Sequence, residues 1–285
     1  MSKQIAKKID GKLIAEKILL DLKAKITKLK RPPGLAVILI GNDSASQLYV
    51  RNKKKASQKI GIEFHDYLCG GKCYPHITEN EILQMIDFLN ADQTVDGIIV
   101  QLPIPKKFDS QKIINRISPQ KDVDGFHPQN KKNFLASKPG IIPPLMQAIN
   151  EALIFTGENL KGKEAVIVVN NPIYSETRKK EFTDLGLKVK ITKPGPNLAN
   201  ETRKADVLVV ILGQKNLIKK SMVKPGAIVI DVGTNLISKN NWTGDVDPKV
   251  AQVAGWLTPV PGGIGPMTVA FLLKNTYEQA KNKLQ

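Results

Sequence analysis

The chain has 285 residues, of which 41% are hydrophobic and 24% charged, and its formal net charge is +17. This length suits two domains, and the hydrophobic content is high enough to form buried cores. No apolar run approaches the roughly 20 residues that a membrane-spanning helix needs, which excludes an integral helical membrane protein.

The excess positive charge fits either a nucleic-acid-binding protein or an enzyme whose substrates are anionic small molecules. Lysines are spread along the whole sequence, whereas arginine is rare and occurs only at positions 31, 51, 116, 178 and 203. Nucleic-acid grooves usually cluster their basic residues and read bases through arginine. The pattern therefore favours anionic small molecules over nucleic acid.

The first 30 residues place apolar side chains at helical spacing, with lysines and acidic residues between them. This pattern predicts an amphipathic helix or a strand–turn–helix. It lacks the unbroken apolar stretch of a secretory signal peptide. We therefore expect a cytoplasmic protein.

The first half of the chain alternates predicted strands and helices. Strands are expected over residues 34–41, 62–68 and 97–100, and helices over residues 42–60 and 78–90. Thr78 and Glu81 have the spacing of a capping box at the start of the second helix. Such alternation is typical of right-handed crossovers and an open parallel sheet.

A possible metal site lies between the second strand and the second helix. His65, Cys69, Cys73 and His76 have a spacing that could supply four zinc ligands. No other sequence feature supports a metal, and polar residues are common in such a connection, so we expect no metal site. A stable disulfide is not expected in a reducing compartment either.

The second half repeats the alternation and resembles a Rossmann domain. Strands are predicted over residues 165–169, 187–191, 206–211 and 227–231. One helix is predicted over residues 143–155, and another follows the first of these strands and ends at Gly186. A last helix over residues 268–283 is expected to return to the first domain. The prediction is an α/β protein with two domains and mostly parallel sheets. One domain comprises residues 1–142 and 268–285, and the other, which is Rossmann-like, comprises residues 143–267.

Three candidate residues for chemistry lie on a predicted helix or directly after a predicted strand in the first half of the chain. Tyr49 and Lys53 are four residues apart and share one face of a helix, although a solvated lysine run has the same pattern. Gln101 follows a parallel strand, where ligands of open α/β sheets bind, although a polar residue also commonly ends a strand.

Two loops also carry candidate residues. Asp122 and Asp124 lie close together in a short loop, where an Asx turn is the alternative interpretation. Residues 258–268 combine prolines with glycines, a composition that allows the main chain to press against a ligand.

Together, and in this order, these segments resemble the methylenetetrahydrofolate dehydrogenase/cyclohydrolase family. Four motifs match the family pattern: Tyr49, Val50, Lys53 and Lys55 in the first, and residues 100–105, 121–126 and 258–268 in the other three. Residues 226–233 and 244–247 are also similar to the family. The resemblance spans nearly the whole chain. It implies an enzyme of one-carbon metabolism that interconverts 5,10-methylene-, 5,10-methenyl- and 10-formyltetrahydrofolate, with NADP as the cofactor of the dehydrogenase step. It also implies a homodimer joined through the Rossmann-like domain.

The resemblance assigns roles to individual residues. Lys53 would be the catalytic amine of the cyclohydrolase step, Gln101 would hydrogen-bond this amine, and Tyr49 would stack on the folate rings. Asp124 would bind the pterin edge. The other substrate-binding residues would be Leu102, Pro261, Gly262 and Gly263. A general base works best with a pKa near the ambient pH, and we expect the positive charges at positions 54 and 55 to lower the pKa of Lys53.

The expected dinucleotide-binding loop departs from the family pattern. The predicted NADP-binding residues are Asn170, Asn171, Pro172, Lys193 and Thr234. Asn170 and Glu176 stand where the family has glycines, which removes close backbone approach and brings a negative charge toward the pyrophosphate. Pro172 lacks an N–H donor. Lys193 is a cation suited to a 2′-phosphate.

These departures give the hypothesis that the chain keeps cyclohydrolase activity but uses NADP weakly or not at all. One alternative is a bifunctional enzyme whose loop binds NADP in an unusual geometry. Another is a non-catalytic folate-binding or scaffolding relative, against which the intact Lys53, Gln101 and Asp124 argue. The sequence does not distinguish NADP from NAD.

Overall fold

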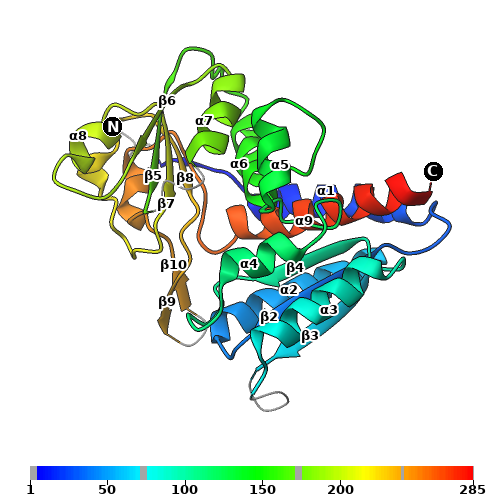
Figure 1. Ribbon diagram of the computed structural model, residues 1–285. Coiled ribbons are helices and arrows are strands. Elements are labelled where there is room, and N and C mark those ends of the chain that lie inside the picture. The colour runs from blue at the N-terminus through cyan, green and yellow to red at the C-terminus, as the bar shows by residue number, and fades with distance from the viewer. Residues whose placement is uncertain (1–4, 71–75, 171–174, 239–240, 285) are drawn as a thin grey trace. The chain divides into compact units, whose positions relative to one another are not determined.

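The computed structural model describes residues 5–70, 76–170, 175–238 and 241–284. The chain divides into two compact units, each built on a parallel sheet (Figure 1). One, here the six-stranded unit, comprises Met1–Ile14 and Leu145–Thr268, and the other, the three-stranded unit, comprises Ala15–Pro144 and Val269–Gln285. The predicted fold class is confirmed. None of the helices in the described part of the chain has the length and apolar character needed to cross a membrane.

The three-stranded unit has the strand order β3–β2–β4. Its strands are β2 (Gly34–Ile40), β3 (Glu63–Cys69) and β4 (Gly97–Gln101), and its helices are α2 (Ser44–Ile60), α3 (Glu79–Ala91), α4 (Ser110–Arg116) and α5 (Pro128–Leu135). Helices α1 (Gly11–Ile26) and α9 (Ile264–Leu284) begin in the other unit and end in this one. Because the chain continues from the central β2 to β3 on one side and then to β4 on the other, the carboxyl ends of β2 and β4 flank a topological switch point.

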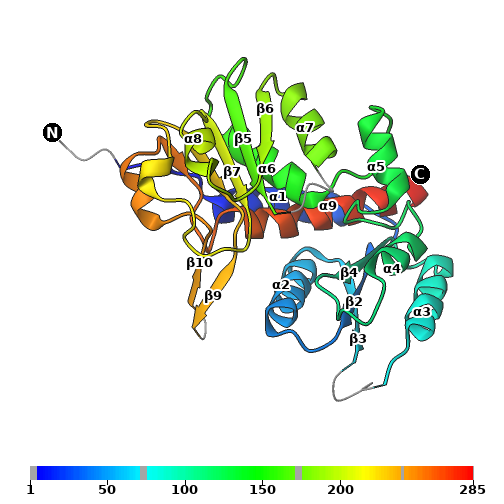
Figure 2. The same cartoon turned by 60° about the vertical axis from the view of Figure 1, so that its left-hand side comes forward.

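Strand β2 is buried on both faces. Its odd-numbered residues from Leu35 to Leu39 pack with side chains of α1, α2 and α9, whereas its even-numbered residues from Ala36 to Ile40 pack with α3. Figure 2 shows α2 and α3 on opposite sides of the strands. A strand covered on both faces needs apolar side chains at every position, which explains the uninterrupted apolar run in the sequence.

Local capping interactions fix the ends of the two long helices in this unit. The Asp43 carboxylate accepts a hydrogen bond from the Ser46 N–H at 2.7 Å, and Gly61 ends α2 with a φ of 87°, a left-handed conformation that favours glycine. Thr78 and Glu81 form the predicted capping box of α3. The side chains of Asp43 and Thr78 satisfy N–H groups that the first turn of a helix leaves without partners.

The six-stranded unit has the order β1–β11–β8–β7–β5–β6 in its described residues, with every adjacent pair parallel. The strands are β1 (Lys7–Lys8), β5 (Glu164–Val169), β6 (Lys188–Thr192), β7 (Val207–Ile211), β8 (Ile228–Asp231) and β11 (Trp256–Leu257). The helices are α6 (Pro144–Phe155), α7 (Ser175–Asp184) and α8 (Leu198–Thr202), with the 3-10 segments η2 (Lys220–Met222) and η3 (Pro248–Gln252). Strand order reverses at β5, which places a second switch point between β5 and β7.

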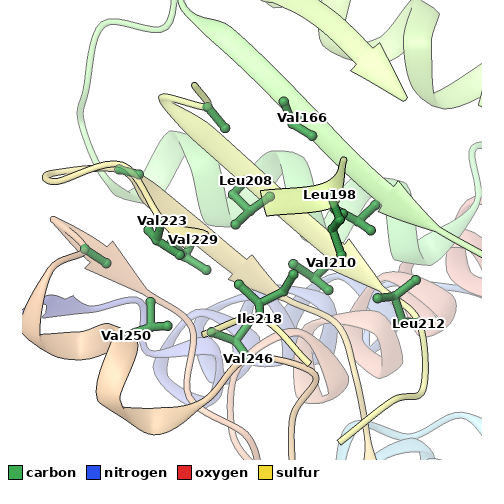
Figure 3. Packing of buried hydrophobic residues seen from close by; sticks show 14 residues of the cluster. Val166, Leu198, Leu208, Val210, Leu212, Ile218, Val223, Val229, Val246 and Val250 are labelled. Atoms are coloured by element: carbon green, nitrogen blue, oxygen red, sulfur yellow. The ribbon is translucent and has the colours of Figure 1, made fainter. Parts of the chain in front are cut away.

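One face of this sheet carries a continuous apolar core. Val166 of β5, Val210 of β7 and Val229 of β8 pack with Leu198 of α8 and with Val250 of η3 (Figure 3). These side chains alternate along their strands with residues that face the other side, so the core fixes which residues of each strand point to which face.

The amino-terminal residues differ from the expected domain division. The prediction assigned residues 1–142 to the first domain, but β1 pairs with β11, and Met1–Ile14 belong to the six-stranded unit. The strand–turn–helix alternative for this region is the one observed, since β1 is followed by α1. A two-residue strand carries too little pattern to predict its pairing partner, which lies almost 250 residues away.

A hairpin of β9 (Asn235–Ser238) and β10 (Asn241–Thr243) is a further element that the sequence did not predict. Figure 2 shows it extending away from the rest of the six-stranded unit. Its strands are short and mostly exposed, so they lack the apolar pattern from which buried strands are predicted.

Candidate functional site

The centre of the candidate site is a hydrogen bond between Lys53 and Gln101. Lys53 lies on α2, which follows β2, and Gln101 is the last residue of β4, so the two meet at the switch point of the three-stranded sheet. The Lys53 Nζ donates to Gln101 Oε1 at 2.8 Å. The Gln101 Nε2 donates to the Leu102 carbonyl at 2.7 Å, which directs the side-chain oxygen of Gln101 toward the amine.

The environment of Lys53 favours its neutral form. Burial lowers its pKa, while the negative charge of Asp124 acts in the opposite direction. The expectation that neighbouring lysines cause this shift is wrong. Lys54 instead forms an ion pair with Asp66, with 2.9 Å between Lys54 Nζ and Asp66 Oδ1, and Lys55 is exposed.

Asp124 lies in a loop that is held from several directions. Burial raises the pKa of Asp124 to about 6, against the opposing effect of the Lys53 charge. The preceding carboxylate, Asp122, accepts hydrogen bonds from the His127 N–H at 2.7 Å and from Asn130 Nδ2 at 3.0 Å. Asp122 therefore folds the loop, whereas Asp124 acts on the amine of Lys53 through its charge.

Two further residues fix this loop to its surroundings. The buried Lys121 donates to the carbonyls of Leu89 and Asp92 at 2.9 and 2.6 Å, and burial lowers the pKa of Lys121 to about 8. Gly125 has a φ of 71°, and a Cβ there would lie 3.0 Å from the Pro143 nitrogen. Only glycine fits this position, which explains why the turn carries one.

Tyr49 and Leu102 lie beside the central pair. Tyr49 is one helical turn before Lys53 on α2, and Leu102 follows Gln101 directly; both are partly exposed. Tyr49, Lys53, Gln101, Leu102 and Asp124 all belong to the three-stranded unit.

The predicted residues Pro261, Gly262 and Gly263 belong to the six-stranded unit. The Gly262 carbonyl accepts a hydrogen bond from the Lys12 N–H at 3.1 Å, and Gly262 has a φ of 107°. A Cβ on Gly263 would lie 2.6 Å from the Pro259 carbonyl oxygen. Local conformation and packing thus favour glycine at both positions, in addition to the expectation that the main chain here approaches a ligand.

The described residues of the predicted NADP set lie at one edge of the six-stranded sheet. Asn170 follows β5, Lys193 follows β6 and Thr234 lies shortly after β8, and all three are exposed. In a parallel sheet these are carboxyl ends, where dinucleotides bind. Asn171 and Pro172 lie outside the described residues.

Two buried carboxylates, those of Asp231 and Asp245, were given no role by the sequence. Asp231 ends β8 and accepts hydrogen bonds from the N–H groups of Gly233, Asp245 and Val246 at 2.9–3.0 Å. Burial, with a smaller contribution from Asp245, raises the pKa of Asp231 to about 7. An aspartate at the end of an apolar strand was the available signal, but the sequence did not show which backbone groups it would bind.

Part of the alternative zinc site lies in the hydrophobic core. Cys69 is 1% exposed and packs beside Met85, with 3.9 Å between the two sulfur atoms. Burial raises the pKa of the Cys69 thiol to about 11, which disfavours the thiolate that zinc requires. Cys73 lies outside the described residues.

Two models of known protein families match the chain. Residues 9–124 match the family model for the tetrahydrofolate dehydrogenase/cyclohydrolase catalytic domain, and residues 143–284 match that for the NAD(P)-binding domain of the same proteins. The bifunctional protein FolD of Ruthia magnifica subsp. Calyptogena magnifica is 41% identical over 278 residues, which cover 97% of this chain and 99% of the relative.

Two solved structures are similar over almost the full length. The bifunctional FolD methylenetetrahydrofolate dehydrogenase/cyclohydrolase of Campylobacter jejuni is 38% identical with a TM-score of 0.91, and the match covers 98% of this chain and 100% of that chain. The dehydrogenase-cyclohydrolase of Trypanosoma brucei, solved with NADP cofactor and an inhibitor, is 30% identical with a TM-score of 0.92, covering 99% of each chain.

Proposed function

The chain belongs to the tetrahydrofolate dehydrogenase/cyclohydrolase family, and we propose on that basis that it catalyses both reactions, converting 5,10-methylenetetrahydrofolate through the methenyl form to 10-formyltetrahydrofolate. The observation that carries the proposal is the Lys53–Gln101 hydrogen bond at the switch point, with Asp124 acting on the same amine. A non-catalytic folate-binding relative would not need an amine whose pKa is lowered in this way.

In the cyclohydrolase step Lys53 moves protons. Water attacks the methenyl carbon, and the neutral Lys53 amine accepts a proton from it. The bond from this carbon to the pterin nitrogen then breaks, and that nitrogen takes up a proton as the formyl group forms. The lowered pKa of Lys53 favours the neutral amine that a general base needs, and Gln101 holds this amine in place through Oε1. Tyr49 and Leu102 are proposed to contact the folate rings, and Asp124 the pterin edge.

The dehydrogenase step requires a nicotinamide cofactor, which accepts a hydride from the methylene carbon. The residues present fit NADP. The exposed Lys193 after β6 offers a cation to a 2′-phosphate, and Asn170 and Thr234 lie at the same sheet edge. We propose that the carboxyl-terminal edge of the six-stranded sheet holds the dinucleotide, with Pro261, Gly262 and Gly263 close to the folate. The NADP complex of the Trypanosoma brucei relative supports this.

A paired assay tests the proposal. One measurement follows the loss of methenyltetrahydrofolate, and the other follows reduced cofactor formed from methylenetetrahydrofolate with NADP or NAD. Both activities are expected in the unaltered protein. Hydrolysis without reduction would support the hypothesis that the loop after β5 has lost cofactor use, and absence of both would overturn the proposed function.

Lys53→Met is expected to lower the cyclohydrolase kcat by about 100-fold or more, the usual contribution of a general base. Lys54→Met is the matched control, because the Lys54 side chain is paired with Asp66, whereas Lys53 is the residue that donates to Gln101. Equal losses of cyclohydrolase kcat in the two variants would show that the activity depends on the positive charge of this helix face and not on Lys53 as a general base.

We further propose a cytoplasmic homodimer. The free, buried thiol of Cys69 suits a reducing compartment. On the six-stranded unit, Leu236 and Ile237 of the β9–β10 hairpin are 53% and 45% exposed, which supports an interface there. Leu236→Asp is expected to shift the mass measured by light scattering from dimer to monomer, whereas an unchanged mass would argue against this interface.

A further inference from the structure

Asn170 connects the carboxyl ends of two neighbouring strands. It directly follows β5, and its Nδ2 donates to the carbonyl of Leu212, which directly follows β7, at 2.5 Å. A second hydrogen bond joins the same residue to the loop after β7: the Gln214 Nε2 donates to Asn170 Oδ1 at 3.3 Å. The Asn170 amide thus bridges the switch point of the six-stranded sheet.

The loop that receives this bridge is held rigidly from its other side. Asp245 is fully buried, and its carboxylate accepts hydrogen bonds from three successive N–H groups, those of Leu212, Gly213 and Gln214, at 2.7, 3.1 and 2.7 Å. The Asp245 N–H in turn donates to Asp231 at 3.0 Å. The Leu212 carbonyl therefore has a fixed position to which Asn170 can bind.

The bridge lies where a dinucleotide crosses a doubly wound sheet. Ligands of such sheets bind in the crevice at the switch point, between the carboxyl ends of the strands on either side. Asn170 stands where the resemblance leads one to expect a glycine, and a side chain directed at the ligand would block close approach. Here the amide is instead directed to the loop after β7, where its polar atoms are satisfied.

We propose that Asn170 is a positioning residue for the dinucleotide, joining the ends of β5 and β7 so that both main chains are correctly placed when NADP binds. This inference rests on the proposed NADP-dependent activity. The Asn170 and Gln214 side chains are exposed and the Asn170–Leu212 bond is only partly buried, so water can replace part of these contacts in a variant. The bridge should therefore affect NADP binding far more than the stability of the fold.

Calorimetric titration with NADP tests the role of Asn170 directly. Asn170→Ala is expected to weaken NADP binding by about three- to tenfold, the effect of losing one neutral hydrogen bond. The unfolding temperature should stay unchanged. Asn159→Ala is the matched control, since Asn159 is an exposed asparagine before the amino end of β5 that accepts one backbone hydrogen bond.

A double-mutant cycle with Gln214→Ala separates this role from a direct contact. If Asn170 acts through the bridge, the double variant should bind NADP about as weakly as Asn170→Ala alone. Unchanged or tighter binding in Asn170→Ala would overturn the inference, as would fully additive effects of the two substitutions. Failure of the unaltered protein to bind NADP would instead remove the proposed dehydrogenase activity, and the inference with it.

Discussion

At the scale of single residues, the candidate site depends on two groups whose protonation is coupled. Burial lowers the pKa of Lys53 and raises that of Asp124 to about 6, so both neutral forms are favoured, while mutual attraction favours both charged forms. The family resemblance implied that Gln101 would hydrogen-bond Lys53, whereas the sequence pattern alone marked these residues only as separate candidates on a helix face and at a strand end. The pKa shift of Lys53 was attributed to adjacent lysines, since burial cannot be read from neighbours along the chain.

Asp124→Asn should move the pH dependence of the cyclohydrolase kcat. The Asp124 charge raises the pKa of Lys53, so its removal lowers that pKa further. Activity requires the neutral amine and rises with pH through the pKa of Lys53, so the rising limb should shift to lower pH in the variant. The measurement is kcat against pH at saturating folate, and a limb that stays in place or moves to higher pH would contradict the coupling.

At the scale of elements, strands and helices with strong patterns were predicted and those with short or polar sequences were not. The apolar runs of β2 and β5 and the capping box of α3 identified their elements directly. Helix α4 has 7 residues and α5 has 8, which is too short for a clear helical period. The pairing of β1 with β11 and the contacts of Asp245 depend on tertiary packing, which local sequence does not encode.

The capping box of α3 provides an element-scale prediction. Thr78 accepts from the Glu81 N–H at 3.3 Å, and Glu81 accepts from the Thr78 N–H at 2.7 Å. Thr78→Ala should lower the free energy of unfolding by about 1 kcal/mol, because it removes a helix N-cap. Urea unfolding measures the change. Thr27→Ala, which removes a hydrogen bond from an exposed hydroxyl to a carbonyl, should lower the free energy of unfolding by less than about 0.5 kcal/mol. Equal losses in the two variants would show that the cap stabilises the fold no more than an ordinary exposed hydrogen bond.

At the scale of the whole molecule, buried carboxylates set part of the dependence of stability on pH. The pKa of Asp231 is about 7 in the folded chain and 3.8 in the reference state, so between these values the folded state holds a proton that the unfolded state has lost. Stability from this group is therefore present at low pH and declines as pH rises through 7.

Asp231→Asn should remove that decline, because asparagine resembles the protonated acid. The unfolding temperature of the variant relative to the unaltered protein should rise between pH 5 and pH 8. Asp247→Asn is a control of opposite sign, since a hydrogen bond from the Lys249 N–H lowers the pKa of Asp247 and its charge stabilises the fold at neutral pH. A constant difference between Asp231→Asn and the unaltered protein would show that Asp231 is charged throughout this range.

The net charge of +17 acts on all anionic ligands at once. Lysines lie along both units, and a positive molecule draws anions toward it, an attraction that added salt screens over about 10 Å at 0.1 M. The cyclohydrolase kcat/KM should therefore fall with ionic strength, more steeply for a folate with several glutamates than for one with a single glutamate, while kcat changes little. Equal slopes for the two substrates would show that the charge serves another partner. Strong, salt-sensitive binding of duplex DNA that competes with folate would identify nucleic acid as that partner.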